Sequence, residues 1–144
     1  MPAVETKTSS GTTVPVDETV AAFAKNTTIT SVTFEDNVRL ENNNANCLFY
    51  GCTALKRVHN IPNAAKGAAS LCYGCTSLVD YPTFAKYSGT LNQAFRNCQQ
   101  LVADATTIVF PPNAVKFGNM FRDCKKITSV PNIPAAAEEI TAMF

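Results

Sequence analysis

The chain has 144 residues, 46% of them hydrophobic, with 12 basic and 11 acidic residues. This length suffices for one domain with its own core. A formal net charge of +1 excludes the strongly basic surface that attracts nucleic acids or acidic membranes. No apolar run reaches the roughly 18 residues that a membrane helix needs. Six cysteines accompany one histidine, which suggests disulfides or zinc until their positions are considered.

Residues 1–16 are rich in threonine and serine and contain two prolines. We expect an extended N-terminal arm here, which docks on a neighbouring chain or packs over the first coil of a repeat domain at residues 17–144. The first residues lack the basic start and apolar stretch of a secretion signal. The sequence therefore predicts a chain that is made in the cytoplasm.

An internal repeat fills residues 22–144. Segments 48–55, 71–78, 94–101 and 120–127 align, and their second residue, here called position one, recurs at spacings of 23, 23 and 26. The position-one residues are Phe49, Cys72, Phe95 and Phe121. A degenerate first copy has Phe23 at position one and Asn26 where later copies have cysteine, and the last two residues begin a sixth copy.

Further columns support this alignment. Position seven is always aliphatic: Ile29, Leu55, Leu78, Leu101 and Ile127. Position ten holds Val32, Val58, Tyr81, Asp104 and Val130, with Asp104 as its one break. A later apolar column holds Val38, Ile61, Phe84, Phe110 and Ile133, and proline follows it in three copies.

Each copy predicts a short strand over positions seven to ten, a turn and a short helical segment. Apolar residues four apart indicate one face of a helical turn; these pairs are Leu91 with Phe95, Phe117 with Phe121 and Ile140 with Phe144. Position three is Gly51, Gly74, Asn97 or Asp123, and these residue types adopt the left-handed conformation that ends such a turn. We therefore expect an α/β repeat solenoid of about five coils, roughly 24 Å long at strand spacing.

The pattern Ala/Met-Phe-x-x-Cys-x-x-Leu-x-x-Val over about 23 residues resembles the BspA-like class of leucine-rich repeat, and residues 48–52, 94–98 and 120–124 carry it. The Met-Phe form is also similar to bacterial surface repeats in which Met-Phe-x-x-Cys recurs. The resemblance covers residues 22–144. It implies a leucine-rich-repeat solenoid used for binding, as in bacterial cell-surface and secreted adhesins, with relatives in viruses and some protists.

Position four is a column of cysteines: Cys52, Cys75, Cys98 and Cys124. We interpret them as buried packing residues, with Asn26 bonding the backbone in the same slot and Cys72 replacing a core phenylalanine. Two alternatives remain: zinc bound by Cys47-x4-Cys52 and Cys72-x2-Cys75, or a disulfide between Cys47 and Cys72. The packing interpretation implies no metal and no cofactor.

Residues that could support catalysis are scattered. His59 is the only histidine and lacks a nucleophile with a third orienting group, so we expect a solvated surface residue. The acidic residues lie in turns and form no acid–base pair: Glu35, Asp36, Glu41, Asp80, Asp104, Asp123, Glu138 and Glu139. There is no phosphate-binding glycine loop. We predict no catalytic residue and no enzyme activity.

Two surfaces could bind partners. Position two holds Tyr50, Tyr73, Arg96 and Arg122, and tyrosine and arginine are frequent binding anchors; the alternative is an exposed flank where any long side chain suffices. The second surface is at the C-terminal end of the repeat domain, where an apolar layer of the last coil is left uncovered by Ile140, Met143 and Phe144. Because terminal repeats normally need a cap, we predict an assembly edge here, covered by a partner or by a second copy.

These features predict a non-enzymatic binding or assembly module that recognises protein or glycan surfaces and has no nucleic-acid partner. The absent signal, the reduced cysteines, the arm and the open edge favour a component of a larger assembly, such as a phage virion that recognises its host. The alternative is a fragment of a secreted bacterial cell-surface adhesin.

Overall fold

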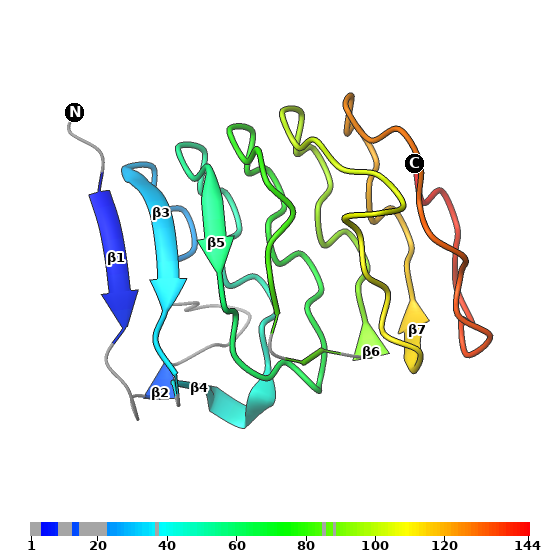
Figure 1. Cartoon of the computed structure of the whole chain (residues 1–144), viewed down its shortest axis with the longest axis horizontal. Helices are drawn as coiled ribbons and strands as arrows, with labels where there is room; N and C mark the ends of the chain where they lie inside the picture. Colours follow the sequence, from blue (N-terminus) through cyan, green and yellow to red (C-terminus); the bar gives the residue numbers. More distant parts are fainter. Residues whose placement is uncertain (1–3, 9–12, 15–22, 37, 85, 88) are drawn as a thin grey trace.

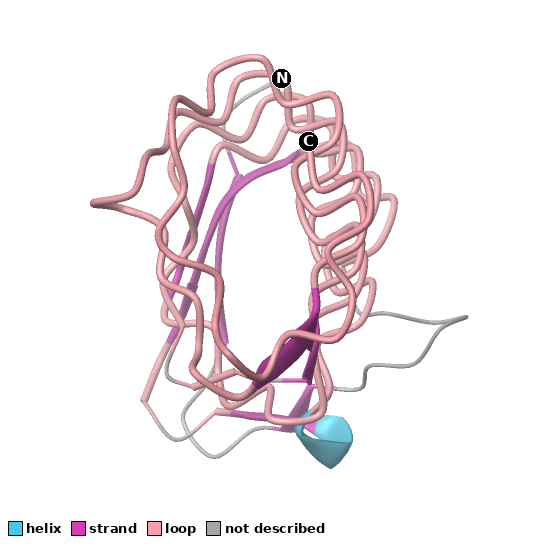
Figure 2. Cartoon of the chain, turned by 90° about the vertical axis from the view of Figure 1, so that its right-hand side faces the viewer, coloured by secondary structure: helices cyan, strands magenta, loops and turns pink. Residues whose placement is uncertain are grey.

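The computed structural model describes residues 4–8, 13–14, 23–36, 38–84, 86–87 and 89–144. The chain winds into coils that follow one another along the long axis of the molecule (Figure 1). Seen along this axis, the coils superimpose on one oval outline (Figure 2). We call this arrangement the coil stack.

Short parallel strands join successive coils. They are β1 (Val4–Thr8), β2 (Thr13–Val14), β3 (Ile29–Phe34), β4 (Arg39–Leu40), β5 (Arg57–His59), β6 (Gly89–Thr90) and β7 (Ala114–Lys116). One sheet has the order β1-β3-β5, and two-stranded sheets pair β2 with β4 and β6 with β7. Isolated parallel bridges, such as Ile61 with Phe84, extend the pairing between the strands.

The repeat spacing in the sequence determines which residues of successive coils lie side by side. The N–H of position one donates to the carbonyl just before position one of the next coil. These bonds run from Phe49 to Leu71 (2.8 Å), Cys72 to Ala94 (2.7 Å), Phe95 to Met120 (3.0 Å) and Phe121 to Met143 (2.7 Å). Residues aligned in the sequence are therefore neighbours along the coil stack.

The predicted fold class, an α/β leucine-rich-repeat solenoid with a helical turn in each coil, is wrong. The described residues contain no α-helix, only strands, turns and coil. Their one helical element is the 3-10 turn η1 (Glu41–Asn43), which is itself interrupted by a left-handed residue at Asn42.

Tight turns replace the expected helical segments because left-handed residues recur every four positions. One column is position three, as expected: Lys25, Gly51, Gly74, Asn97 and Asp123, with φ between 61° and 75°. The other lies four residues earlier: Cys47, Ser70, Gln93, Asn119 and Ala142, with φ between 49° and 58°. A right-handed helix cannot continue through such residues. The turns nevertheless point every fourth side chain inward, so Leu91 and Phe95 are both buried.

A ladder of phenylalanine rings at position one runs through the core. The rings of Phe23 and Phe49 stack with centroids 5.2 Å apart, and those of Phe95 and Phe121 stack at 5.8 Å. Stacked aromatic pairs add to the burial energy that holds one coil against the next.

The ladder is interrupted at Cys72, and a large residue in the same coil fills the space. Position ten is valine in the preceding coils but Tyr81 here, and its ring lies 5.0 Å from that of Phe95. The smaller residue at position one is thus compensated by a larger residue at position ten of the same coil, which keeps the core densely packed.

Asp104 does not lie in the position-ten column, because the pairing slips by one residue in its coil. Ala103 takes the buried place and is 4% exposed. Its carbonyl accepts the N–H of Thr128 at 3.1 Å, 25 residues on where the repeat spacing is 26. The Asp104 carboxylate accepts hydrogen bonds from the hydroxyl and the N–H of Thr106 at 2.6 and 2.8 Å. These bonds lower the pKa of Asp104 below its ordinary value.

The N-terminal arm is described only in part. Residues 4–8 form β1 and residues 13–14 form β2, whereas the boundary predicted between residues 16 and 17 lies outside the described residues. The division into an arm and a repeat domain therefore stays a prediction. Within the described part of the chain, no helix has the length and apolar character needed to cross a bilayer.

Candidate functional site

The cysteine column forms a ladder of hydrogen bonds inside the coil stack. Each position-four thiol donates to the position-one carbonyl of the preceding coil: Cys52 to Phe23 (2.9 Å), Cys75 to Phe49 (3.0 Å), Cys98 to Cys72 (3.1 Å) and Cys124 to Phe95 (3.0 Å). Asn26 fills the slot in the first coil, where its Oδ1 accepts the N–H groups of Thr28 and Ile29. These thiols link coils through the core.

Burial keeps the thiols of Cys52, Cys98 and Cys124 protonated, as donors must be. It raises the pKa of Cys52 to about 12 and that of Cys124 to about 11, and it raises the pKa of Cys98 well above its ordinary value. None of the four column cysteines is in a disulfide. No group of three or more metal-ligating side chains gathers within the part of the chain that the structure describes.

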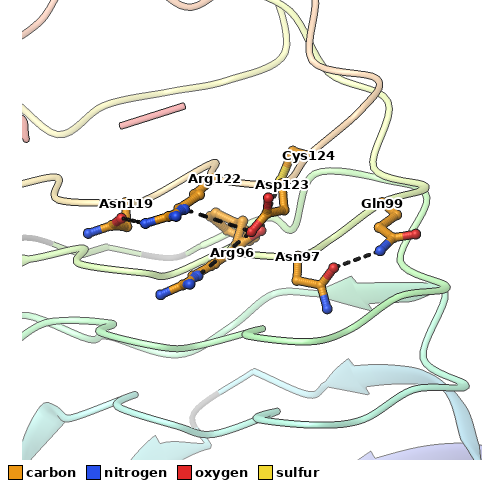
Figure 3. Close-up of polar contacts among 8 residues, drawn as sticks. Arg96, Asn97, Gln99, Asn119, Arg122, Asp123 and Cys124 are labelled. Atoms are coloured by element: carbon orange, nitrogen blue, oxygen red, sulfur yellow. Dashed lines mark hydrogen bonds and ion pairs between the residues drawn. The ribbon is translucent and has the colours of Figure 1, made fainter. Parts of the chain in front are cut away.

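The four position-two side chains form a second ladder, on the surface. The rings of Tyr50 and Tyr73 stack with centroids 5.0 Å apart and planes 19° apart. The guanidinium of Arg96 lies 5.5 Å from the Tyr73 centroid, within cation–π range. Arg122 continues the row (Figure 3). We call these four residues the tyrosine–arginine ladder.

One carboxylate lies between the two arginines. Asp123 Oδ2 is 3.9 Å from the Nε of Arg96 and 3.9 Å from that of Arg122, too far for a direct hydrogen bond. Arg122 also donates to Asn119 Oδ1 at 3.3 Å. Two guanidinium groups and one carboxylate leave one net positive charge here, beside half-exposed tyrosine rings. The arrangement suits a ligand that offers hydrogen-bond acceptors and a flat or apolar face.

The other predicted site residues are placed differently. At the assembly edge, Ile140 and Phe144 are 55% and 64% exposed, while Met143 is 6% exposed. The Phe144 ring stacks on Phe121 at 6.2 Å, so it extends the core ladder to the surface of the last coil. His59 is half-buried in β5.

Sequence reasoning missed a group of clefts around the coil that holds Phe84. They adjoin Phe84, Tyr87 and Val109. The prolines that follow the later apolar column were the available signal, because proline cannot donate to the backbone ladder and so marks the place where the coil turns away from its neighbour.

Comparison with known proteins gives no relative: no family profile, curated protein or solved structure matches this chain. A function for it must therefore be argued from the geometry of its surfaces.

Proposed function

We propose that this chain is a non-enzymatic recognition module that binds a protein or glycan surface through the tyrosine–arginine ladder. The observation that carries this proposal is the contact of Tyr50, Tyr73 and Arg96 in one surface row. Because these side chains already hold one another in place, binding costs little side-chain entropy. Tyrosine and arginine are also the residue types that contribute most often to binding energy.

We further propose that the module belongs to a larger assembly, such as a phage virion that recognises its host. The support is the column of cysteines without a disulfide, which suits a chain made in a reducing compartment. The alternative is a part of a secreted bacterial adhesin. The genes that flank its own distinguish the two, because virion structural genes and secretion or anchoring genes form different neighbourhoods.

The test uses fluorescently labelled chain with a glycan array and a panel of intact bacterial strains. A double variant, Tyr73→Ala with Arg96→Ala, removes the centre of the ladder. We expect its affinity to fall at least about tenfold, because two adjoining anchors are lost.

Lys56→Ala is the matched control, because Lys56 is an exposed cation beside β5 and not in the ladder; it should bind as the unchanged chain does. Circular dichroism and thermal unfolding check that all variants fold. No saturable binding to any glycan or strain, or equal binding by the folded double variant, would contradict the proposal.

A further inference from the structure

Charge is unevenly distributed along the row of turns that carries the tyrosine–arginine ladder. Residues 50–54 and 73–77 hold no charged side chain, whereas residues 96–100 and 122–126 of the next two coils hold four cations and one carboxylate. We call these two later segments the basic end of the ladder. They carry a formal charge of +3, although the whole chain carries only +1. The rest of the chain is net acidic, so an anion is attracted to the basic end and not to the molecule as a whole.

Contacts between the two coils bring the charged side chains of the basic end together. The two segments are joined by a main-chain hydrogen bond of 2.8 Å. Arg96 and Arg122 flank the Asp123 carboxylate, each with its Nε at 3.9 Å (Figure 3). Three residues further on, Lys126 Nζ reaches back to the preceding coil and donates to Gln100 Oε1 at 2.6 Å. One carboxylate cannot neutralise four cations, so three positive charges are left for a ligand.

These cations are accessible to a ligand from the solvent. The side chain of Arg122 is 50% exposed and that of Arg96 is 27% exposed, and Lys125 and Lys126 are both exposed. The guanidinium of Arg96 is held in place by the Tyr73 ring, 5.5 Å from its centroid. A guanidinium in a fixed position binds an oxyanion through two parallel hydrogen bonds, which strengthen and orient the contact. The basic end therefore suits a carboxylate, sulfate or phosphate group.

The side chains around these charges favour a sugar over a protein surface. The arginines and lysines are accompanied by neutral amide side chains: Asn97, Gln99, Gln100 and Asn119. Amides both donate and accept hydrogen bonds, as sugar hydroxyls do. A protein interface has an apolar centre instead. In the described part of the chain, the exposed large apolar side chains lie outside the ladder and its basic end, at Val102, Val109, Ile140 and Phe144.

We propose that the ligand of the tyrosine–arginine ladder is an anionic glycan, whose acidic groups are bound at the basic end. This inference rests on the function proposed above and names the chemical class of the ligand. The acidic groups accept hydrogen bonds from Arg96 and Arg122 and are attracted by Lys125 and Lys126. The uncharged part of the sugar chain contacts the two tyrosines.

The experiment measures the fluorescence anisotropy of a short, labelled dextran sulfate titrated with the full chain at about 0.1 M salt. Two further probes separate charge from sugar. Labelled dextran of equal length has the same sugar backbone without the charge, and labelled polyglutamate has the charge without the sugar. We expect saturable binding of dextran sulfate, at least about tenfold tighter than that of either control probe.

Two double variants test where the anion binds. Lys125→Gln with Lys126→Gln removes two cations of the basic end and leaves the ladder itself intact, so the affinity for dextran sulfate should fall about fivefold. Lys66→Gln with Lys86→Gln is the matched control, because both lysines are exposed and lie outside the ladder and its basic end. It changes the net charge by the same amount and should bind within about twofold of the unchanged chain. Thermal unfolding checks that both variants fold.

Three outcomes would overturn the inference: no saturable binding of dextran sulfate, equal losses in the two double variants, or polyglutamate bound as tightly as dextran sulfate. Equal losses would mean that only net charge matters, and tight polyglutamate binding would mean that the ligand is an acidic peptide. The function proposed above fails separately. If a neutral glycan binds and Tyr73→Ala with Arg96→Ala abolishes that binding, while dextran sulfate does not bind, the ladder is a recognition site and only the anionic ligand is wrong.

Discussion

The column of thiols makes a quantitative prediction about reactivity. Alkylating reagents attack the thiolate and not the thiol. Burial raises the pKa of Cys52 from 9.0 to about 12 and that of Cys124 from 9.0 to about 11. At about pH 8, below all these values, the thiolate fraction falls tenfold for each pKa unit. We therefore expect native Cys52 to react about 1000-fold, and Cys124 about 100-fold, more slowly than the same residues in the unfolded chain.

The assay exposes the native chain to iodoacetamide, quenches samples at intervals and measures each cysteine by mass spectrometry after digestion. The same chain in concentrated guanidinium chloride supplies the reference rate for every residue, so differences in local sequence cancel. Cys124 should be modified before Cys52, because Cys124 is half-buried and Cys52 is fully buried.

A native Cys52 rate within about tenfold of its unfolded rate would refute this reasoning. So would modification of Cys52 ahead of Cys124. Either result would mean that the thiols of Cys52 and Cys124 are not held as protonated donors between the coils.

Three further predictions concern stability. Cys52 keeps its proton to about pH 12 when folded and loses it near pH 9.0 when unfolded, so the folded state binds more protons in that window. Cys52 alone should therefore lower the free energy of unfolding by about 1.4 kcal/mol per pH unit there, and the raised pKa values of Cys98 and Cys124 add to the decline. Urea titrations that show no decline from pH 9 to 10 would count against it. Gly74→Ala should lower the free energy of unfolding by about 1 kcal/mol through backbone strain alone, because φ is +75° and the nearest atom to a new Cβ lies at 3.9 Å. Asn97→Gly, at the same position of the next coil, should not destabilise the protein. Thermal unfolding of the two variants compares them. Cys72→Phe should overpack the core and lower the free energy of unfolding by about 1–3 kcal/mol, and Tyr81→Val should leave a cavity and lower it by about 2–5 kcal/mol. The double variant should lose at least about 1 kcal/mol less than the sum of the two single losses. Strictly additive losses in chemical unfolding would contradict the compensation in volume between the two positions.

The repeat alignment could be predicted because it depends on residue type in every copy. Position seven is aliphatic throughout, and its side chains from Ile29 to Leu101 are buried. The left-handed residue at position three was also predictable, because glycine, asparagine and aspartate adopt that conformation most readily. Lys25 is the exception, with φ of 61° in the degenerate first copy.

The helical segment was predicted wrongly because a helix and a series of tight turns produce the same four-residue spacing of buried apolar side chains. A residue such as Phe95 lies four positions after Leu91, which suits a helix, but turns with a left-handed residue every fourth position give the same inward pattern. The second left-handed column contains Cys47, Ser70 and Gln93, whose residue types do not favour that conformation. Contacts with the neighbouring coils impose it, so a single copy carries no signal for it. This column also gives Cys47 a place in the repeat.

The slip at Asp104 could not be foreseen for a similar reason. The alignment places the residue 26 positions on opposite Ala103, whereas in the structure the N–H of Thr128, 25 positions on, donates to the Ala103 carbonyl, and Asp104 bonds Thr106. A carboxylate gains more from backbone and hydroxyl donors at the surface than from a buried slot without partners. The energetic preference moved the register by one residue.

The coil that breaks the aromatic ladder also holds two large tyrosines, Tyr81 and Tyr87, beside one of the clefts. Tyr81 replaces a valine, and Tyr87 pairs with Ala64 of the preceding coil, so both tyrosines are larger than their neighbours in the stack. Packing explains the size of Tyr81, because Cys72 leaves room for a ring. The Tyr81 hydroxyl is paired with that of Tyr87, and burial raises the pKa of both, so the two rings carry a neutral polar pair into the core.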